Sequence, residues 1–351
     1  MRVLVDISHP AHVHFFRHPL RLLREGGAEV RVTSRVKDVA RALLDELGIA
    51  HEILSIEPSS MVGRARELIV RDFRLWGVVR RFRPDVMAAI GGTCVAHVGA
   101  LTGVPALVFY DTENAHLQNA ITYPLAHHVF VPRCYQRWIP AGRSTRYAGY
   151  HELAYLHPEY FHPDRDVALA QGLSPKDPTF LLRLVAWQAS HDVGKRGWSP
   201  DLVRRVVARL AAVGTVLMSS EAPLPGDLRP YAYAGKPGLL HHVMAFCRGF
   251  VGESATMASE CAVLGVPAVY AARTGRGYTD EQERRYGLVR NTSTLTVEAL
   301  DAAIDWLLSR GPAENLHARA QLLAETIDVS RYVVDCIENA AAHTYPVPRG
   351  A

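Results

Sequence analysis

The chain has 351 residues, of which 48% are apolar and 21% are charged, and 39 basic side chains against 35 acidic ones give a net charge of +4. This composition is typical of a globular protein and excludes a disordered or fibrous chain, while the length favours two domains. The charge is mild and almost entirely arginine, which fits an anionic substrate or a membrane surface better than a nucleic acid. We therefore expect no nucleic-acid partner.

The location of the protein is indicated by what its sequence lacks. No apolar run approaches the roughly 20 residues that cross a bilayer, and the N-terminus lacks the apolar stretch and cleavage site of a secretory signal. The cysteines form no CxxC pair and no short framework, so we expect them to be reduced and mostly buried; they are Cys94, Cys134, Cys247, Cys261 and Cys336. The sequence predicts a cytoplasmic protein.

Strand-like and helix-like segments alternate along the chain. In the first half the predicted strands are 2–7, 28–33, 51–54, 85–90, 105–110 and 128–131, and the predicted helices are 14–26, 36–48, 61–82, 93–102 and 115–126. In the second half the predicted strands are 179–185, 214–219, 231–234, 249–251, 267–271 and 288–290, and the predicted helices are 199–212, 238–246, 255–265, 279–286, 296–309, 312–324 and 328–341. Apolar strands separated by helices are typical of parallel sheets buried on both faces.

This alternation predicts an α/β protein with two doubly wound, Rossmann-like domains facing a cleft. The proline- and glycine-rich stretch 140–178 interrupts the pattern. We therefore expect an N-terminal domain over 1–150, a passage over 151–178, a C-terminal domain over 179–327, and a final helix within 328–351 that packs back on the first domain.

Two turns between a strand and a helix share one design. The first follows the strand at 2–7 and the second follows the strand at 249–251. Free N–H groups at a helix N-terminus, together with the positive end of the helix dipole, suit an anion such as a diphosphate. The sequence therefore predicts ligand-binding edges in both domains.

The first turn is rich in histidine. His9, His12, His14 and His18 lie within ten residues, and the spacing of His14 and His18 is compatible either with a metal site or with ordinary helix packing. No cysteine or paired carboxylate completes a ligand set nearby, so we expect no metal. His12 lies where the strand gives way to the helix, and an imidazole there can take a proton from a hydroxyl.

Two further loops of the first domain follow predicted strands. The first contains Gly91, Gly92 and Thr93, where glycines let the backbone approach a ligand. The second contains polar side chains that can bind hydroxyls or act as acid and base, namely Asp111, Glu113, Asn114 and His116. For Asp111 and Glu113 the alternative is a helix N-cap.

In the second domain the strand at 179–185 leads into polar and aromatic residues that are candidates for substrate binding: Trp187, Gln188, Ser190 and His191. The alternative is a loop whose tryptophan covers the core. Glu260 lies one helical turn beyond Thr256, where a carboxylate can bind ribose hydroxyls, or it is a solvated helix residue.

The segment Arg64–Arg83 combines seven arginines with apolar side chains. Such a helix either lies on anionic lipid or covers the sheet while its arginines face water.

The sequence resembles the GT-B glycosyltransferase superfamily, including peptidoglycan UDP-GlcNAc transferases and hydrolysing UDP-GlcNAc 2-epimerases. It resembles more closely a domain-of-unknown-function family of predicted bacterial and archaeal glycosyltransferases. The motifs that carry the resemblance are the run from Asp6 to Phe16, Pro84-Asp85-Val86 with Gly91-Gly92, Glu113-Asn114-Ala115 with Asn119, and Ser254-Ala255-Thr256 with Glu260 and Leu264-Gly265-Val266-Pro267. Two departures are Ala255 and Thr256, which replace glycines, and Glu253, which adds a carboxylate beside the expected diphosphate.

The resemblance implies a metal-independent transferase without a cofactor, which moves a sugar from a nucleotide diphosphate sugar, UDP-linked, to a glycan or lipid-linked hydroxyl. His12 would be the base, with Glu113 as the alternative, and His9 would contact substrate. The implied donor-binding residues are Gly252, Ser254, Ala255, Thr256, Met257, Glu260, Asp280 and Gln282. The alternatives are an epimerase or hydrolase of the same fold and a non-catalytic protein that binds sugar nucleotides.

Overall fold

The chain divides into two units after His157 and again after Glu325 in the computed structural model, which describes residues 1–37, 39–58, 60–185 and 197–343. Unit 1 comprises Met1–His157 and Thr326–Ala351, and unit 2 comprises Pro158–Glu325. Residues 151–157 thus belong to the first unit and 158–178 to the second, so the expected passage over 151–178 is divided between them.

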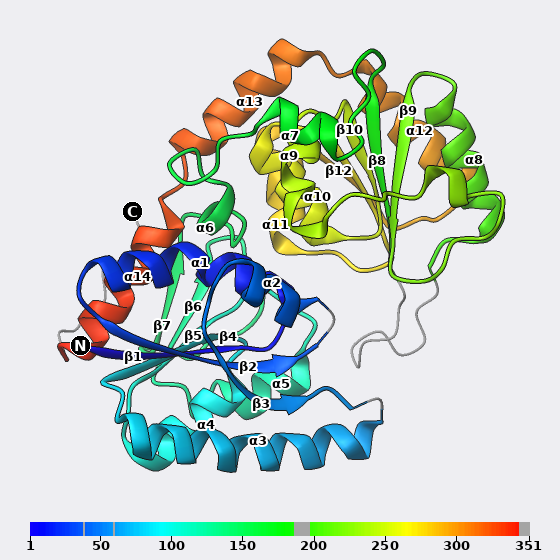
Figure 1. The fold of residues 1–351 in the computed structure, drawn as a ribbon. Coiled ribbons are helices and arrows are strands. Elements are labelled where there is room, and N and C mark those ends of the chain that lie inside the picture. Colours follow the sequence, from blue (N-terminus) through cyan, green and yellow to red (C-terminus); the bar gives the residue numbers. More distant parts are fainter. Residues whose placement is uncertain (38, 59, 186–196, 344–351) are drawn as a thin grey trace. The chain divides into compact units, whose positions relative to one another are not determined.

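Unit 1 is built on a seven-stranded parallel sheet in the order β3-β2-β1-β4-β5-β6-β7 (Figure 1). The strands are β1 (Arg2–Ile7), β2 (Glu29–Val36), β3 (Glu52–Ile56), β4 (Val86–Ile90), β5 (Ala106–Phe109), β6 (His128–Pro132) and β7 (Ser144–Tyr147). All five residues of β4 and all four of β5 are buried. Burial along whole strands requires helices on both faces of the sheet.

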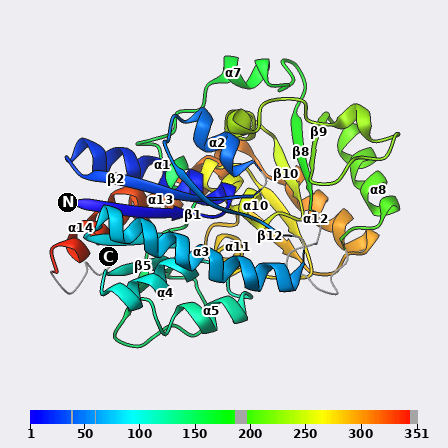
Figure 2. The same ribbon diagram turned by 60° about the horizontal axis from the view of Figure 1, so that its bottom comes forward.

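Two helical layers cover this sheet. The helices are α1 (Pro10–Glu25), α2 (Ala40–Glu46), α3 (Met61–Phe82), α4 (Thr93–Thr102), α5 (His116–Thr122), α6 (Leu153–Leu156) and α14 (Val329–Ala341). Helices α3, α4 and α5 cover one face, and α1 and α14 cover the other (Figures 1 and 2). Because α14 returns after unit 2, unit 1 is made of two separate stretches of chain.

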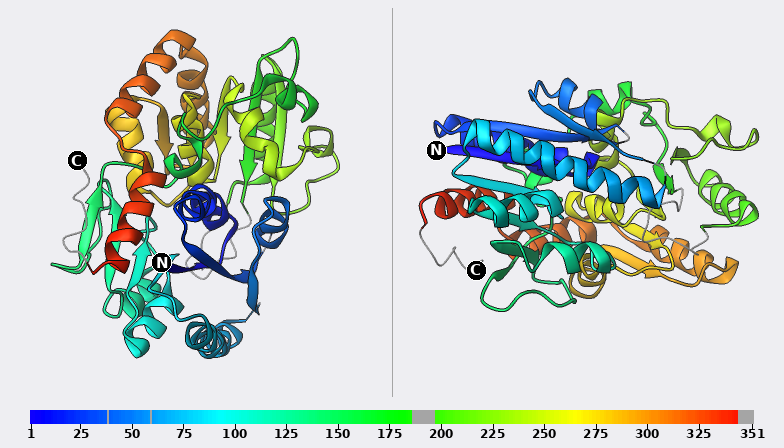
Figure 3. Two further views of the ribbon diagram at one scale, coloured as in Figure 1. Left: turned by 60° about the vertical axis from the view of Figure 1, so that its left-hand side comes forward. Right: turned by 90° about the horizontal axis from the view of Figure 1, so that it is seen from below.

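Helix α14 is fixed in unit 1 by both apolar and polar contacts. It packs against α1, α6 and β4 (Figure 3). The Tyr332 ring lies against Tyr147, with centroids 5.3 Å apart, and the Ser330 hydroxyl donates to the Ala154 carbonyl at 2.6 Å. The last described helix is therefore part of the core of unit 1.

Unit 2 is built on a five-stranded parallel sheet in the order β12-β11-β10-β8-β9. The strands are β8 (Thr179–Leu184), β9 (Thr215–Ser220), β10 (Gly249–Gly252), β11 (Ala268–Ala271) and β12 (Val289–Thr292). The helices are α7 (Arg165–Ala170), α8 (Pro200–Ala211), α9 (Leu240–Ala245), α10 (Ala255–Leu264), α11 (Gly277–Glu281), α12 (Val297–Ser309) and α13 (Pro312–Ala324), with short helical turns η1 (Arg229–Tyr231), η2 (Pro237–Leu239) and the π-helical η3 (Gln282–Tyr286).

The structure corrects the predicted elements in two places. The strand predicted over 231–234 is wrong: Arg229–Tyr231 forms a helical turn, and only Ala232 pairs with a strand, by an isolated bridge to Met218. The region 140–178, read as irregular, contains strand β7 and helices α6 and α7. Strand β7 escaped prediction because it is an edge strand of four residues, only one of which is buried.

Candidate functional site

The turn after β1 places His12 inside helix α1. This helix begins at Pro10, earlier than the predicted residue 14, because the Nδ1 atom of His9 accepts the Ala11 N–H at 3.2 Å and caps the helix. Nδ1 of His12 accepts the N–H of Ser8 at 3.4 Å. Burial, together with His9 and His151, lowers the pKa of His12 well below its usual value, so its ring is neutral at pH 7.

A buried ion pair lies at the end of strand β1. The Arg71 guanidinium, from α3, donates to Oδ2 of Asp6 at 2.7 Å, and the Thr33 hydroxyl donates to Oδ1 at 2.7 Å. Both charged side chains are buried. This positive charge also helps to lower the pKa of His12.

A second histidine, His151, faces Asp111 at the carboxyl edge of the sheet of unit 1. Its Nδ1 lies 3.3 Å from Oδ2 of Asp111, and its ring packs on Phe15 with centroids 4.6 Å apart. The side chain is buried, and burial lowers its pKa although Asp111 raises it. The sequence analysis missed His151 because it lies after β7; the strand-like Ser144–Tyr147 was the signal that could have revealed it.

The other polar residues after β5 have different surroundings. Glu113 accepts the N–H of Gln136 at 2.9 Å. The alternative that Asp111 or Glu113 caps α5 is wrong, because that helix follows Ala115 and has no side-chain cap. Both amide atoms of Asn114 are buried without a hydrogen-bond partner among the described residues, whereas His116 is exposed as the first residue of α5.

The glycine turn after β4 is required by the fold. Gly91 and Gly92 have φ values of 65° and 27°, and a Cβ on Gly92 would lie 2.8 Å from Val95. The Thr93 hydroxyl is hydrogen-bonded to the Thr122 hydroxyl at 2.8 Å. The fold alone explains why these three residues are present. Their expected contacts with substrate stay a prediction.

His14 and His18 differ from His12 in their surroundings. His14 packs against the Tyr155 ring, with centroids 5.3 Å apart, and Arg17 donates to Nε2 of His18 at 3.0 Å. Within the described ranges, no group of three or more histidine, cysteine or acidic side chains is arranged to hold a metal ion.

In unit 2 helix α10 opens at the carboxyl end of the central strand β10. Ser254 is its N-cap, and its hydroxyl accepts the Met257 N–H at 3.3 Å. The N–H groups of Ala255 and Thr256 precede the first intrahelical hydrogen bond and therefore have no acceptor within the helix. Gly252 is required by packing, because a Cβ there would lie 2.6 Å from the Arg183 carbonyl oxygen.

Glu253, next to this N-terminus, points its carboxylate into the unit. Its two oxygens accept the N–H groups of Val185 and Trp198, each at 3.1 Å, and the side chain is buried. The carboxylate thus binds the backbone on both sides of 186–197. Two backbone donors compensate its charge.

Two of three expected donor contacts, Glu260 and Gln282, are buried. Glu260 is 6% exposed and bonded to Nε2 of His241 at 2.9 Å, so the alternative of a solvated helix residue is wrong. Gln282 is fully buried, and its amide donates to the Ser259 hydroxyl at 2.8 Å. Its expected contact with the donor sugar stays a prediction. Asp280 lies in α11 and is partly exposed.

Four candidates, Trp187, Gln188, Ser190 and His191, lie outside the described residues. The described cysteines are buried except Cys134, which is intermediate. No helix in the described ranges is both long enough and apolar enough to span a membrane.

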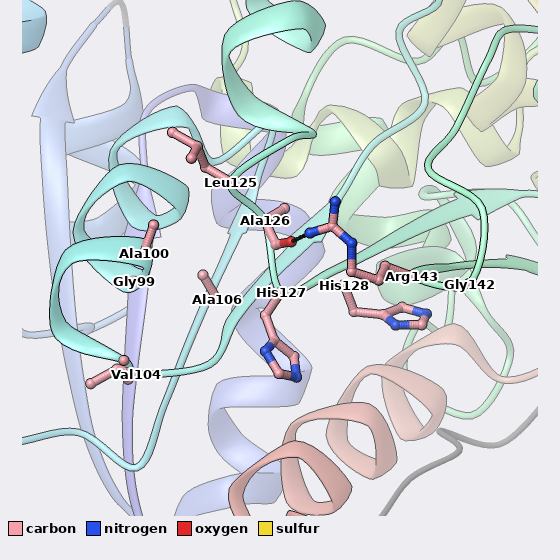
Figure 4. Close-up of a pocket in the computed structure, with 11 residues that line it drawn as sticks. Gly99, Ala100, Val104, Ala106, Leu125, Ala126, His127, His128, Gly142 and Arg143 are labelled. Carbon is pink, nitrogen blue, oxygen red and sulfur yellow. Dashed lines mark hydrogen bonds between the residues drawn. The ribbon is translucent and has the colours of Figure 1, made fainter.

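A cavity of about 360 Å³ lies at the other edge of the sheet of unit 1 (Figure 4). It is lined by residues next to the amino ends of β5, β6 and β7, among them His127, His128 and Arg143. The Arg143 guanidinium is bonded to the Ala126 carbonyl at 2.8 Å. None of the candidate residues lines this cavity, so it is separate from the carboxyl-edge site.

Solved structures with the same fold include glycosyltransferases and nucleotide-sugar epimerases. The Staphylococcus aureus MnaA–UDP complex is 12% identical, covers 100% of both chains and has a TM-score of 0.70. UDP-GlcNAc 2-epimerase from Neisseria meningitidis bound to UDP-GlcNAc is 12% identical over 98% of both chains, with a TM-score of 0.63. The spinosyn rhamnosyltransferase SpnG with spinosyn aglycone is 12% identical over 94% of this chain and 98% of its own, with a TM-score of 0.63.

These likenesses confirm the predicted fold: two α/β units with parallel sheets, of the GT-B kind. Among proteins compared by sequence, the uncharacterized protein MJ0665 of Methanocaldococcus jannaschii is 20% identical over 275 residues, which is 76% of this chain and 80% of that protein. The match that carries the family resemblance is longer. Residues 1–286 match the family described as "Protein of unknown function (DUF354)", and the chain belongs to that family.

Proposed function

We propose that the protein is a metal-independent GT-B glycosyltransferase that moves a sugar from a UDP-linked donor to a hydroxyl of a glycan or lipid-linked acceptor. The observation that carries this proposal is the N-terminus of α10, which opens at the carboxyl end of the central strand of unit 2. Ligands of open α/β sheets bind at this edge. Unit 2 would hold the donor and unit 1 the acceptor.

The α10 terminus has the chemistry that a leaving diphosphate needs. The N–H groups of Ala255 and Thr256, with that of Met257 once Ser254 releases it, are fixed dipoles that stabilise growing negative charge. The Glu253 carboxylate does not oppose this role, because it is bonded to Val185 and Trp198. Glu260 and Asp280 remain the proposed contacts to ribose and sugar, and Gln282 supports α10 through Ser259.

Unit 1 offers polar groups suited to an acceptor. His12 and Glu113 are the candidate bases, and the buried amide of Asn114 lacks a described partner that a sugar hydroxyl would supply. His9 and Asp111 lie in the loops after β1 and β5, and His116 is the first residue of α5. Two similar structures support UDP as the nucleotide, since one is a complex with UDP and the other is a complex with UDP-GlcNAc.

Calorimetric titration with UDP, GDP, TDP and CDP, with and without magnesium, tests the donor site. We expect selective binding of UDP that does not need the metal. Thr256→Asp should weaken binding at least about tenfold, because it adds a negative charge to the first turn of α10. Ala313→Asp, which adds the same charge to the exposed first turn of α13, should change nothing.

Turnover distinguishes the activities open to this fold. Transfer of sugar to an added glycan or lipid-linked acceptor supports the proposal. Release of free nucleotide without an acceptor would identify a hydrolase or epimerase, and binding without turnover would identify a non-catalytic protein. The absence of binding to all four nucleotides would overturn the donor site itself.

We also propose that helix α3 rests on the inner surface of the cytoplasmic membrane, where a lipid-linked acceptor is reached. Its exposed apolar side chains Val62, Ile69, Phe73 and Trp76 recur at helical spacing, and Phe73 is 69% exposed. Arg66 and Arg80 are exposed in the same stripe. The acidic residues of α3 are bonded elsewhere, Glu67 to Arg35 and Asp72 to His97. A basic, apolar face fits anionic lipid.

Vesicle sedimentation tests this surface. Vesicles of phosphatidylcholine with phosphatidylglycerol should bind the protein, and phosphatidylcholine alone should not. Replacing Ile69 and Phe73 by serine should reduce binding at least about tenfold. Leu316→Ser removes a similarly exposed side chain from α13 and should have no effect. Equal binding by the α3 variant would rule out this face.

A further inference from the structure

In the Asp111–His151 pair, one imidazole nitrogen faces the carboxylate and the other has no partner among the described residues. Nδ1 of His151 lies 3.3 Å from Oδ2 of Asp111, whose other oxygen accepts the Thr112 hydroxyl at 3.1 Å. His151 is 7% exposed and packs on Phe15. Its Nε2 is buried and has no hydrogen-bond partner within the part of the chain that the structure describes. A buried polar atom without a partner costs about 1–3 kcal/mol, which an arriving hydroxyl donor would recover.

The partner of Nδ1 determines where the proton of the neutral ring resides. The negative charge of the Asp111 carboxylate, 3.3 Å from Nδ1, favours the tautomer of His151 that has its proton on Nδ1, and this tautomer has its lone pair on Nε2. The sequence analysis favoured His12 as the base, but the partner of His12 has the opposite character. Its Nδ1 accepts the backbone N–H of Ser8, which leaves the proton on Nε2. His12 is therefore arranged to donate a hydrogen bond, and His151 to accept one.

A second aspartate–histidine pair in unit 1 shows what a purely structural pair looks like. Nδ1 of His97 lies 2.7 Å from Oδ2 of Asp72, and its Nε2 lies 3.3 Å from the Ile121 carbonyl oxygen. Both nitrogens of His97 thus have protein partners on α3 and at α5. The open Nε2 of His151 distinguishes the two pairs.

We propose that His151, oriented by Asp111, is the base that takes the proton of the attacking acceptor hydroxyl, while His12 donates a hydrogen bond at the same edge. This assignment rests on the proposed function. In the step, the hydroxyl O–H bond breaks and its proton moves to Nε2 of His151. The oxygen forms a bond to the anomeric carbon of the donor sugar, and the bond from that carbon to the diphosphate breaks, its electron pair leaving with the nucleotide diphosphate. Asp111 is a positioning residue that stabilises the charged imidazole.

Nitrogen NMR of the ring atoms tests the tautomers without any need for turnover. With ¹⁵N-labelled histidine, Nε2 of His151 and Nδ1 of His12 should both show the shift of an unprotonated nitrogen. Substitution of each histidine by glutamine assigns its signals. In Asp111→Asn the fixed pattern of His151 should be lost, while Asp72→Asn should leave it unchanged. A proton on Nε2 of His151 in the native protein would overturn the proposal, whatever the activity proves to be.

Kinetics test the role itself. His151→Gln keeps a polar side chain but cannot take up a proton, and should lower kcat by at least about 100-fold. His12→Gln retains a donor and should lower kcat by less than about tenfold. His97→Gln is the matched control and should leave kcat and UDP affinity unchanged. A larger fall in kcat for His12→Gln than for His151→Gln would identify His12 as the base. A native protein that does not bind UDP would instead refute the proposed donor site.

Discussion

The turns after β1 and β10 have the same place in their sheets and different chemistry. Each joins a buried parallel strand to a helix N-terminus, but His9 caps α1 through an imidazole nitrogen, whereas Ser254 caps α10 through a hydroxyl. At the end of β1 the Asp6 carboxylate is paired with a buried guanidinium. Beside β10 the Glu253 carboxylate accepts two backbone N–H groups, those of Val185 and Trp198.

This difference would suit the two turns to different kinds of ligand contact. Around the first turn, burial and nearby positive charge keep His12 neutral, which suits hydrogen bonding. Around the second turn, the Glu253 carboxylate points into unit 2, and the free N–H groups at the start of α10 suit an anion. A substitution that removes the interactions around one of these turns should therefore affect that turn and leave the other unchanged.

The largest effect is expected from Arg71→Leu. It leaves the buried Asp6 carboxylate without its ionic partner, and should lower the free energy of unfolding by about 3–5 kcal/mol in urea denaturation. The double variant Asp6→Leu with Arg71→Leu should recover most of that loss, because no isolated charge remains. A double variant as unstable as the single one would contradict the ion-pair explanation. UDP affinity of the folded single variant should be unchanged.

Gly252→Val should have the next largest effect. The added Cβ would lie 2.6 Å from the Arg183 carbonyl oxygen, which demands a shift of backbone, and we expect a loss of about 1–3 kcal/mol in unfolding free energy. The control is Gly226→Ala, where an added Cβ meets no atom within 4 Å. If the two variants were equally stable, the close approach of β8 and β10 would not be as the structure has it.

Glu253→Gln distinguishes two roles for this carboxylate. The amide keeps one acceptor for the N–H groups of Val185 and Trp198, and stability should fall by about 1–2 kcal/mol. If the native charge faced the diphosphate, its removal would tighten UDP binding. Because the charge is bonded inward, we expect the dissociation constant measured by calorimetry to be unchanged or higher. Tighter binding would place the carboxylate at the ligand.

The smallest effect is expected from Ser254→Ala. Loss of the N-cap should cost about 1 kcal/mol of unfolding free energy. Ser199→Ala removes the matching cap of α8, whose hydroxyl accepts the Leu202 N–H at 3.2 Å, and should cost a similar amount. Only the Ser254 variant should also weaken UDP binding. Equal UDP affinities would remove Ser254 from the proposed donor site.

The fold was predictable because buried parallel strands appear in the sequence as continuous apolar runs. Strand β4 is the clear case, with five buried residues in succession. The incorrect predictions concern short segments. Tyr231-Ala232-Tyr233-Ala234 has the composition of a strand without forming one, and β7 forms a strand although its sequence did not predict one. Four residues contain too little periodicity to decide between a strand and a turn.

The site was only partly predictable, because strand order fixes which edge a residue occupies and not where its side chain points. Glu253 follows a strand as a ligand-binding residue would, yet its carboxylate is bonded inward. Gln282 is buried on a π-helical turn that no sequence pattern predicted. His151 needed β7 to be recognised before its pairing with Asp111 could be anticipated. Side-chain direction depends on packing from distant parts of the chain.

The discontinuity of unit 1 has a consequence for biosynthesis. All of unit 2, Pro158–Glu325, is translated before helix α14, whose buried residues include Val333, Cys336 and Ile337. Until that helix leaves the ribosome, the faces of α1, α6 and β4 that it covers have no partner. Unit 2 can therefore complete its fold during synthesis, while unit 1, although begun first, is completed last.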